Sequence, residues 1–301
     1  MWTNPWKFKE GFFIGGALIL VGLALQLVAG PVVWETFSWP VNVVVFGALL
    51  ALIESMFLLR KKVYAFRFLC TYHAAVPALV YVVALTMVMG LTRQQSDGTW
   101  LHSMLTFWPF VLVYLYVALI LGIIILNRLA HLQSWRRDVP FLLNHVGIFL
   151  ALTTGSLGNG DMQRVKMITT IGGAEWRALT NDGAVKEMPL SIELKKFIME
   201  TYDDGSPKRF ASEIHVTTKE STTLDAVVDV NKPVEVDGWK IYQYGYDTQQ
   251  GANSRMSILE LVKDPWLPIV YCGIYMMLAG AVCMFVFGGR NRKTVVVNRM
   301  K

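Results

Sequence analysis

The chain has 301 residues, of which 54% are hydrophobic and 17% are charged. About a quarter of the residues of soluble domains are charged, so this composition excludes an ordinary soluble protein and predicts a membrane protein. The net charge of +6 gathers between apolar runs and gives no reason to expect nucleic acid as a partner.

Six apolar runs are long enough to span a bilayer core of about 30 Å, which takes roughly 20 helical residues. The first is expected to be a span rather than a cleaved signal peptide, because it is long and glycine-rich and lacks a small-residue cleavage site. The fifth is the shortest. The runs cover residues 11–30, 41–59, 63–91, 103–126, 139–155 and 265–287.

Basic residues crowd alternate connections between these runs, with Arg93 as the main exception. The positive-inside rule therefore places both termini in the cytoplasm and the long segment after the fifth run outside. We expect a multi-pass membrane protein that also contacts lipid headgroups. The basic clusters are Lys7 and Lys9; Arg60, Lys61, Lys62 and Arg67; Arg128, Arg136 and Arg137; and Arg290, Arg292, Lys293, Arg299 and Lys301.

The segment 156–262 is expected to be the one extracytoplasmic domain. Its alternating apolar residues predict strands, and turn signals such as Asp237-Gly238 separate them. This pattern suggests a β-rich sandwich, in which residues 191–202 form either a helix or an edge strand. The predicted fold is a polytopic α-helical membrane protein of about six transmembrane helices. Residues 1–155 hold five of them, 156–262 form the β-rich domain, and 263–301 hold the sixth helix and a basic cytoplasmic tail.

The three cysteines, Cys70, Cys272 and Cys283, lie in apolar runs and form no CxxC pair. Neither a thioredoxin-like redox centre nor a zinc site is therefore indicated. The sequence also shows no supported Ser/His/Asp arrangement and no phosphate-binding glycine loop, so no catalytic residue is predicted.

Two histidines, His73 and His145, lie inside apolar runs, where an imidazole is costly and usually faces a partner, a cavity or a cofactor. At 1.5 Å per helical residue, a span entering near Val63 places His73 roughly 15 Å deep, and one entering near Val139 places His145 roughly 9 Å deep. Haem accepts such axial nitrogens. The two could serve one haem, pair with histidines of another subunit, or only hydrogen-bond across helices. By contrast, His102, His131 and His215 are expected to be solvated.

Three stretches carry a resemblance to a known family. The segment Asn144-His145-Val146-Gly147 is similar to the span before the periplasmic domain in ResB/CcsB-type cytochrome c biogenesis proteins. The run Val230-Asn231-Lys232-Pro233, with Gly238-Trp239-Lys240-Ile241-Tyr242-Gln243, resembles a second stretch of that family. Asp264-Pro265, with Gly273 in the last run, resembles a third.

This resemblance implies the unfused B subunit of a system II cytochrome c synthetase (haem lyase), itself a non-catalytic subunit. Such a subunit handles haem b, helping to move haem across the membrane and present it for covalent attachment to apocytochrome c. The implied partner is a CcsA-type tryptophan-rich membrane protein, and the implied location is a bacterial inner membrane. The family's third-span histidine is an axial ligand of the haem iron and matches His73; His145 lies in the haem region.

Two other functions remain open from the residues. A b-type cytochrome subunit passing electrons from quinol would use His73 and His145 as a pair within one chain. A non-haem scaffold would use its outer domain to bind a protein ligand.

Overall fold

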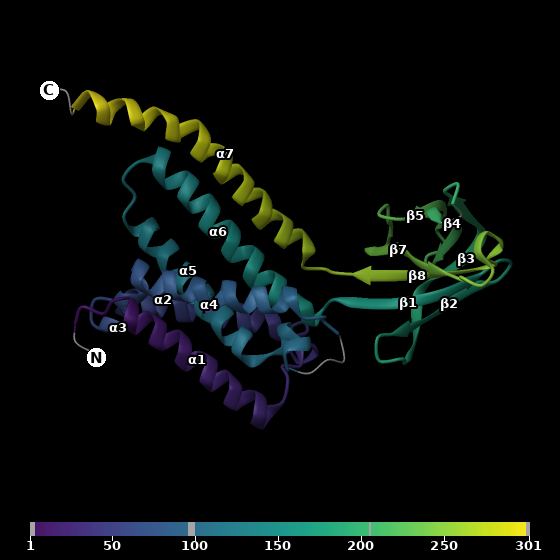
Figure 1. Cartoon of the computed structure of the whole chain (residues 1–301), viewed down its shortest axis with the longest axis horizontal. Coiled ribbons are helices and arrows are strands. Elements are labelled where there is room, and N and C mark those ends of the chain that lie inside the picture. The colour runs from purple at the N-terminus through teal and green to yellow at the C-terminus, as the bar shows by residue number, and fades with distance from the viewer. Residues whose placement is uncertain (1–3, 96–99, 205, 299–301) are drawn as a thin grey trace. The chain divides into compact units, whose positions relative to one another are not determined.

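The computed structural model describes residues 4–95, 100–204 and 206–298. The chain divides into a helical unit, Met1–Asp161 with Trp266–Lys301, and a sheet unit, Met162–Pro265. In Figure 1 the helical unit runs from purple to teal and ends in the yellow helix, and the sheet unit is mainly green. Two residues of the last basic cluster, Arg299 and Lys301, lie outside the described residues.

Six helices in the described part of the chain are long and apolar enough to cross a membrane, which confirms the predicted polytopic fold. A seventh helix, α3, is short, and single 3-10 turns punctuate the loops. The helices are α1 (Phe8–Ala29), α2 (Val41–Leu59), α3 (Tyr64–Leu69), α4 (Tyr72–Leu91), α5 (Trp108–Ala130), α6 (Trp135–Leu157) and α7 (Leu267–Asn298); the turns are η1 (Trp34–Phe37), η2 (Trp100–His102), η3 (Met104–Thr106), η4 (Gly158–Gly160) and η5 (Gly251–Asn253).

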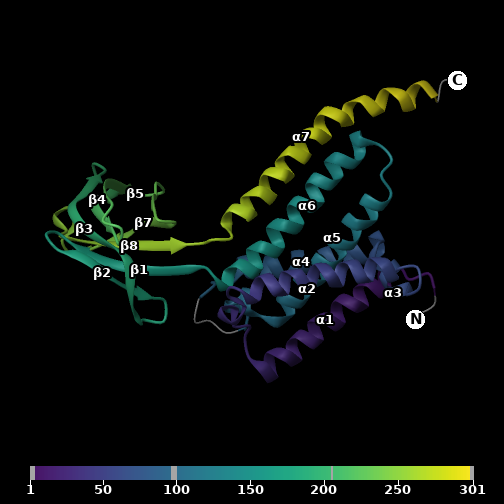
Figure 2. The same cartoon turned by 180° about the vertical axis from the view of Figure 1, so that it is seen from behind.

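Helix α5 is the centre of the helical unit and contacts α1, α2, α4 and α6. Its buried residues, such as Val113, Val117 and Ile123, face these neighbours, because a helix that is apolar all round buries itself in protein or lipid. Helices α6 and α7 lie side by side in both views (Figures 1 and 2). Gly147 and Gly273 allow this approach, since a Cβ built on either residue would lie 2.5 Å from the other's carbonyl oxygen.

The third apolar run is not one helix. The chain leaves helical geometry at Thr71, whose backbone is extended (φ −110°, ψ 153°) and whose hydroxyl donates to the Phe68 carbonyl at 2.6 Å. Such local side-chain bonds compete with the helix ladder. The expected continuous helix from Val63 was therefore wrong: the spanning helix α4 begins at Tyr72.

The sheet unit is one antiparallel sheet in the order β5-β4-β3-β2-β1-β8-β7-β6. Its first and last strands are neighbours, paired from Gln163 opposite Lys263 to Thr170 opposite Met256. The strands are β1 (Gln163–Thr170), β2 (Ala174–Thr180), β3 (Val185–Thr201), β4 (Pro207–Thr218), β5 (Thr223–Asp229), β6 (Val234–Val236), β7 (Trp239–Tyr246) and β8 (Met256–Lys263).

The sheet curls so that its two ends face one core, instead of forming the two packed sheets of a sandwich. Ser212 of β4 donates to the side chain of Gln243 in β7 at 2.7 Å, although these strands lie far apart in the sheet order. Residues 191–202 fall almost entirely in β3, between β2 and β4, so both the helix and the edge-strand interpretations were wrong. The tight turn at Asp237 (φ 51°) and Gly238 (φ 76°) joins β6 to β7 as predicted.

Candidate functional site

His145 is a half-buried histidine in the middle of α6. Its Nδ1 lies 2.8 Å from the carbonyl oxygen of Phe141, one turn earlier. Because a carbonyl can only accept a hydrogen bond, Nδ1 carries the proton and Nε2 keeps its lone pair. The imidazole also stacks on the Phe141 ring, with centroids 3.8 Å apart and planes 18° apart. The ring is thus fixed in both tautomer and orientation, as for many histidines that bind metals.

An ion pair supports this stack from the neighbouring helix. The guanidinium carbon of Arg128, in the last turn of α5, lies 4.8 Å from the Phe141 ring centroid. Its Nε lies 3.0 Å from Oδ1 of Asp138 in the first turn of α6. The two atoms do not have the angle of a hydrogen bond, so the contact is an electrostatic attraction between the two charged groups. In the sequence Arg128 indicated only topology, and no local pattern pointed to this contact. The stack of His145 on Phe141, by contrast, agrees with their spacing of four residues on a helix.

The motif Asn144-His145-Val146-Gly147 divides between two surfaces of α6. Gly147 packs on Gly273 of α7, and Asn144 lies against Gly280 of the same helix. Residues three apart share a helix face, so this face is the one that packs on α7. His145, one residue along, stacks within its own helix beside α5. Packing of α6 on α7 therefore explains Asn144 and Gly147 but not His145.

His73 is the second residue of α4, so the single helix from Val63 on which its expected depth of roughly 15 Å rested is not present. Its ring lies 4.1 Å from Tyr72 and 4.7 Å from Phe8 of α1. Neither ring nitrogen has a hydrogen-bond partner among the described residues. Its carbonyl has no donor at Pro77, which lacks an N–H, and Gly11 of α1 packs against it. Both ring nitrogens of His73 are available to a ligand, because neither has a hydrogen-bond partner among the described residues.

The structure gives His73 and His145 different surroundings. Helix α4 packs on α1 and α5, whereas α6 packs on α5 and α7, and the two rings make no contact within the described part of the chain. Across that same part, no three His, Cys, Asp or Glu side chains form a metal-binding group. Each histidine thus offers a ring nitrogen without the other histidine beside it.

The other three histidines, unlike His73, each have a polar contact at Nδ1. His102 and His131 are exposed, and each holds Nδ1 near a backbone carbonyl, at 3.1 Å from Arg93 and 2.9 Å from Asn127. His215 lies in the sheet unit, with Nδ1 2.6 Å from a carboxylate oxygen of Asp225 on the adjacent strand. Sequence periodicity did not indicate that contact.

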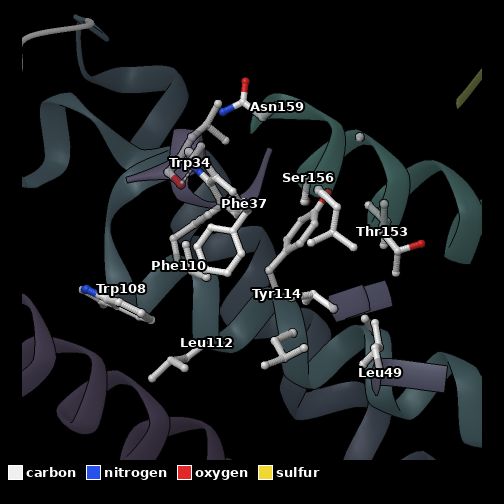
Figure 3. A pocket seen from close by; sticks show the side chains of 18 of the residues that line it. Trp34, Phe37, Leu49, Trp108, Phe110, Leu112, Tyr114, Thr153, Ser156 and Asn159 are labelled. Carbon is white, nitrogen blue, oxygen red and sulfur yellow. Dashed lines mark hydrogen bonds between the residues drawn. The ribbon is translucent and has the colours of Figure 1, made fainter. Parts of the chain in front are cut away.

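A cavity of about 520 Å³ lies elsewhere in the helical unit. Figure 3 shows its lining, with side chains from η1, α2, α5 and α6, including Phe37, Tyr114 and Ser156. The lining is mainly apolar, as is usual for small-molecule sites. No histidine is among the described residues that line it, so it offers no imidazole to an iron.

Comparisons with known proteins match part of the chain. Residues 134–260 match the model of the ResB-like family, from the start of α6 to β8. The cytochrome c biogenesis protein CcsB of Prochlorococcus marinus subsp. pastoris is 27% identical over 118 residues, which are 39% of this chain and 27% of that relative. The chain thus matches about a quarter of the relative's length.

A solved structure, the cytochrome c heme lyase CcmF, is 15% identical, with a TM-score of 0.35, and the match covers 68% of this chain and 34% of that one. A likeness this weak carries no argument. The family match, which includes His145 and most of the sheet unit, and the curated relative together support a ResB/CcsB-type protein.

Proposed function

We propose that this chain is a haem-handling membrane subunit of a system II cytochrome c synthetase. It helps move haem across the membrane and presents it for covalent attachment to apocytochrome c. The single observation that carries the proposal is His145, which lies in the ResB-like region and keeps Nε2 free while Nδ1 donates to Phe141. The name of the curated relative, a cytochrome c biogenesis protein, supports the same role.

In this proposal the chain binds and orients its cargo. Haem supplies an iron that accepts an axial imidazole nitrogen. His145 offers Nε2 in a fixed orientation, and His73 is the second candidate ligand. Since the two histidines have different helix neighbours, each would share its haem with a donor from elsewhere. A CcsA-type tryptophan-rich membrane partner is the proposed source of the missing ligand and of the missing synthetase half.

The basic clusters favour an orientation in a bacterial inner membrane with both termini cytoplasmic. The sheet unit would then be periplasmic, where it would dock or shield the apocytochrome. Attachment needs reduced iron and free cysteine thiols on the apocytochrome. This chain's part in that step is to hold the haem, and its membrane-spanning helices provide an apolar surface for the porphyrin.

The test is haem content of the chain co-purified with its partner. We expect His145→Ala to lower bound haem at least tenfold and to change the reduced-state absorption spectrum, and added imidazole to restore part of both. His73→Ala should act likewise if it binds a second haem. His131→Ala is the matched control, because His131 makes the same Nδ1 contact with a carbonyl but is exposed, and it should leave haem unchanged.

Wild-type haem content in both histidine variants, with intact cytochrome c maturation, would overturn the proposal and favour a non-haem scaffold. Stable haem with two imidazole ligands in the chain purified alone would instead favour the electron-transferring b-type cytochrome.

A further inference from the structure

We propose that Arg128 binds a carboxylate of the same molecule whose iron His145 binds, so that the turn between α5 and α6 recognises the anionic edge of the porphyrin. This inference rests on the proposed function and extends it to a second part of the ligand.

The first observation is that Asp138 holds Arg128 in place while part of the guanidinium group makes no hydrogen bond. Its Nε side faces Asp138, whose other oxygen accepts the backbone N–H groups of Gln133 and Ser134, each at 2.7 Å. Asp138 is 5% exposed and Arg128 is 28% exposed at the side chain. The two terminal nitrogens of Arg128 donate to no group in the described part of the chain. They form the planar fork that matches a carboxylate with two parallel hydrogen bonds.

The second observation is the excess of positive charge around this turn. Arg136 and Arg137 lie at the start of α6; the former sits over the Trp135 ring and the latter donates to Gln133 at 2.9 Å. With Arg128, this turn carries three guanidinium groups and one carboxylate, Asp138. That carboxylate is already bound by two backbone N–H groups and Arg128, so the turn has a positive charge to offer an incoming anion.

The third observation is the position of Arg128 relative to the iron ligand. Arg128 and His145 both contact the Phe141 ring, at 4.8 Å from its centroid to Cζ and 3.8 Å from centroid to centroid. A free Nε2 and a free guanidinium fork thus both belong to side chains that contact one aromatic ring. A flat, apolar molecule with a central metal and carboxylates at its edge can use both groups at once. Porphyrins with propionate side chains have this chemistry.

A lipid phosphate is the other anion that a guanidinium at this place could bind. It differs from the porphyrin carboxylate in one measurable way, because esterifying the propionates removes the porphyrin's charge and leaves the lipid unchanged.

The experiment compares haem with haem dimethyl ester on the full chain co-purified with its partner. We expect wild type to bind the free acid about tenfold to a hundredfold more tightly than the ester, as for a charged hydrogen bond. Arg128→Gln should lose this preference and keep the imidazole-ligated spectrum, and Arg128→Lys should recover part of it. Arg60→Gln is the matched control, because Arg60 also lies at the end of a spanning helix and against an aromatic ring. It follows the last residue of α2, and its Cζ lies 3.5 Å from the Phe57 ring centroid.

Arg128→Gln leaves the buried Asp138 without its ion pair and could fail to fold. The double variant Arg128→Gln/Asp138→Asn removes both charges and gives the same reading on ligand preference. Equal wild-type affinities for acid and ester would overturn the inference without touching haem binding. So would an acid preference that survives in the variants, or a variant effect of equal size on both ligands. Absence of haem binding by wild type would overturn the proposed function itself.

Discussion

The indole N–H of Trp266 donates to Oδ2 of Asp161 at 2.7 Å. These residues stand at the two points where the chain passes between its units, after Asp161 and before Trp266. The same carboxylate accepts the backbone N–H of Trp39 at 2.6 Å and the side-chain amide of Asn42 at 2.8 Å. One side chain therefore ties both crossing points to the start of α2.

Replacing Asp161 should destabilise the helical unit. Asp161→Ala removes the hydrogen bond from Asn42, which is fully buried, and the one from the Trp266 indole N–H, at a cost of about 1–3 kcal/mol each. Asp161→Asn should also destabilise, because its NH₂ group would face a donor. Thermal unfolding of the full chain in detergent measures both variants. Glu35→Ala, an exposed carboxylate in η1, is the control and should leave the melting temperature unchanged; equal melting of all variants would contradict the role of Asp161.

The contribution of Asp161 should depend on pH. Burial raises the pKa of its carboxyl, but the hydrogen bonds from Trp39, Trp266 and Asn42 outweigh burial and hold the pKa below its ordinary value of 3.8. The folded state thus binds this proton less readily than the unfolded state, so the stabilisation is complete above the ordinary pKa and is lost as the pH falls through the lower one. We expect the gap in melting temperature between wild type and Asp161→Ala to shrink below about pH 4. A gap that stays constant from pH 7 to pH 3 would count against this.

The contact between α6 and α7 should not tolerate one added methyl group. In Gly147→Ala the new Cβ would meet the Gly273 carbonyl oxygen at 2.5 Å and Met277 Cγ at 2.9 Å, and overpacking typically costs about 1–3 kcal/mol. Gly47→Ala in α2 is the same substitution where no atom lies within 4 Å, and it should be neutral. Melting temperatures of the two variants decide the point: equal values would show that α6 and α7 separate easily.

The sequence predicted the spans because length and apolar composition suffice to identify a membrane-crossing helix. The same composition did not reveal that the third run is broken at Thr71, since a hydroxyl bonded to Phe68 changes backbone direction without changing hydropathy. The break in the continuous helix assumed in placing His73 was therefore not predictable from hydropathy. For residues 191–202, strand pairing with β2 and β4 decided the structure, and such long-range contacts leave no local periodicity.

The surroundings of His145 were only half predictable. Phe141 lies four residues earlier, so a stack between them follows from helical spacing. Arg128 approaches from α5, and only the packing of the α5–α6 turn shows that its guanidinium lies over the same ring. A similar limit applies to Gln243, which belongs to a stretch that resembles the family but whose partner Ser212 is 31 residues away in sequence.

Gln243 should act by closing the curled sheet. Its Oε1 accepts from Ser212, and its Nε2 donates to Ser257 at 2.9 Å and to the Gly245 carbonyl at 3.0 Å. Both serines are fully buried and also bond to each other at 2.7 Å, so Gln243→Leu removes their hydrogen bonds with the amide but not the bond between them, and it should cost about 1–3 kcal/mol. Limited proteolysis of the sheet unit within the full chain, as a function of temperature, measures the loss. Gln249→Leu, at an exposed position, is the matched control.

A second substitution separates this role from direct contact with a ligand. Adding Ser212→Ala to Gln243→Leu removes a hydroxyl that has already lost its hydrogen bond with Gln243, so the double variant should be less destabilised than the sum of the single variants. Haem content per folded molecule should stay at the wild-type level in all three variants, because neither residue belongs to the helical unit that holds His73 and His145. Additive losses of stability would mean that the two side chains are not coupled across the sheet. A loss of haem in protein that remains folded would mean that Gln243 takes part in binding.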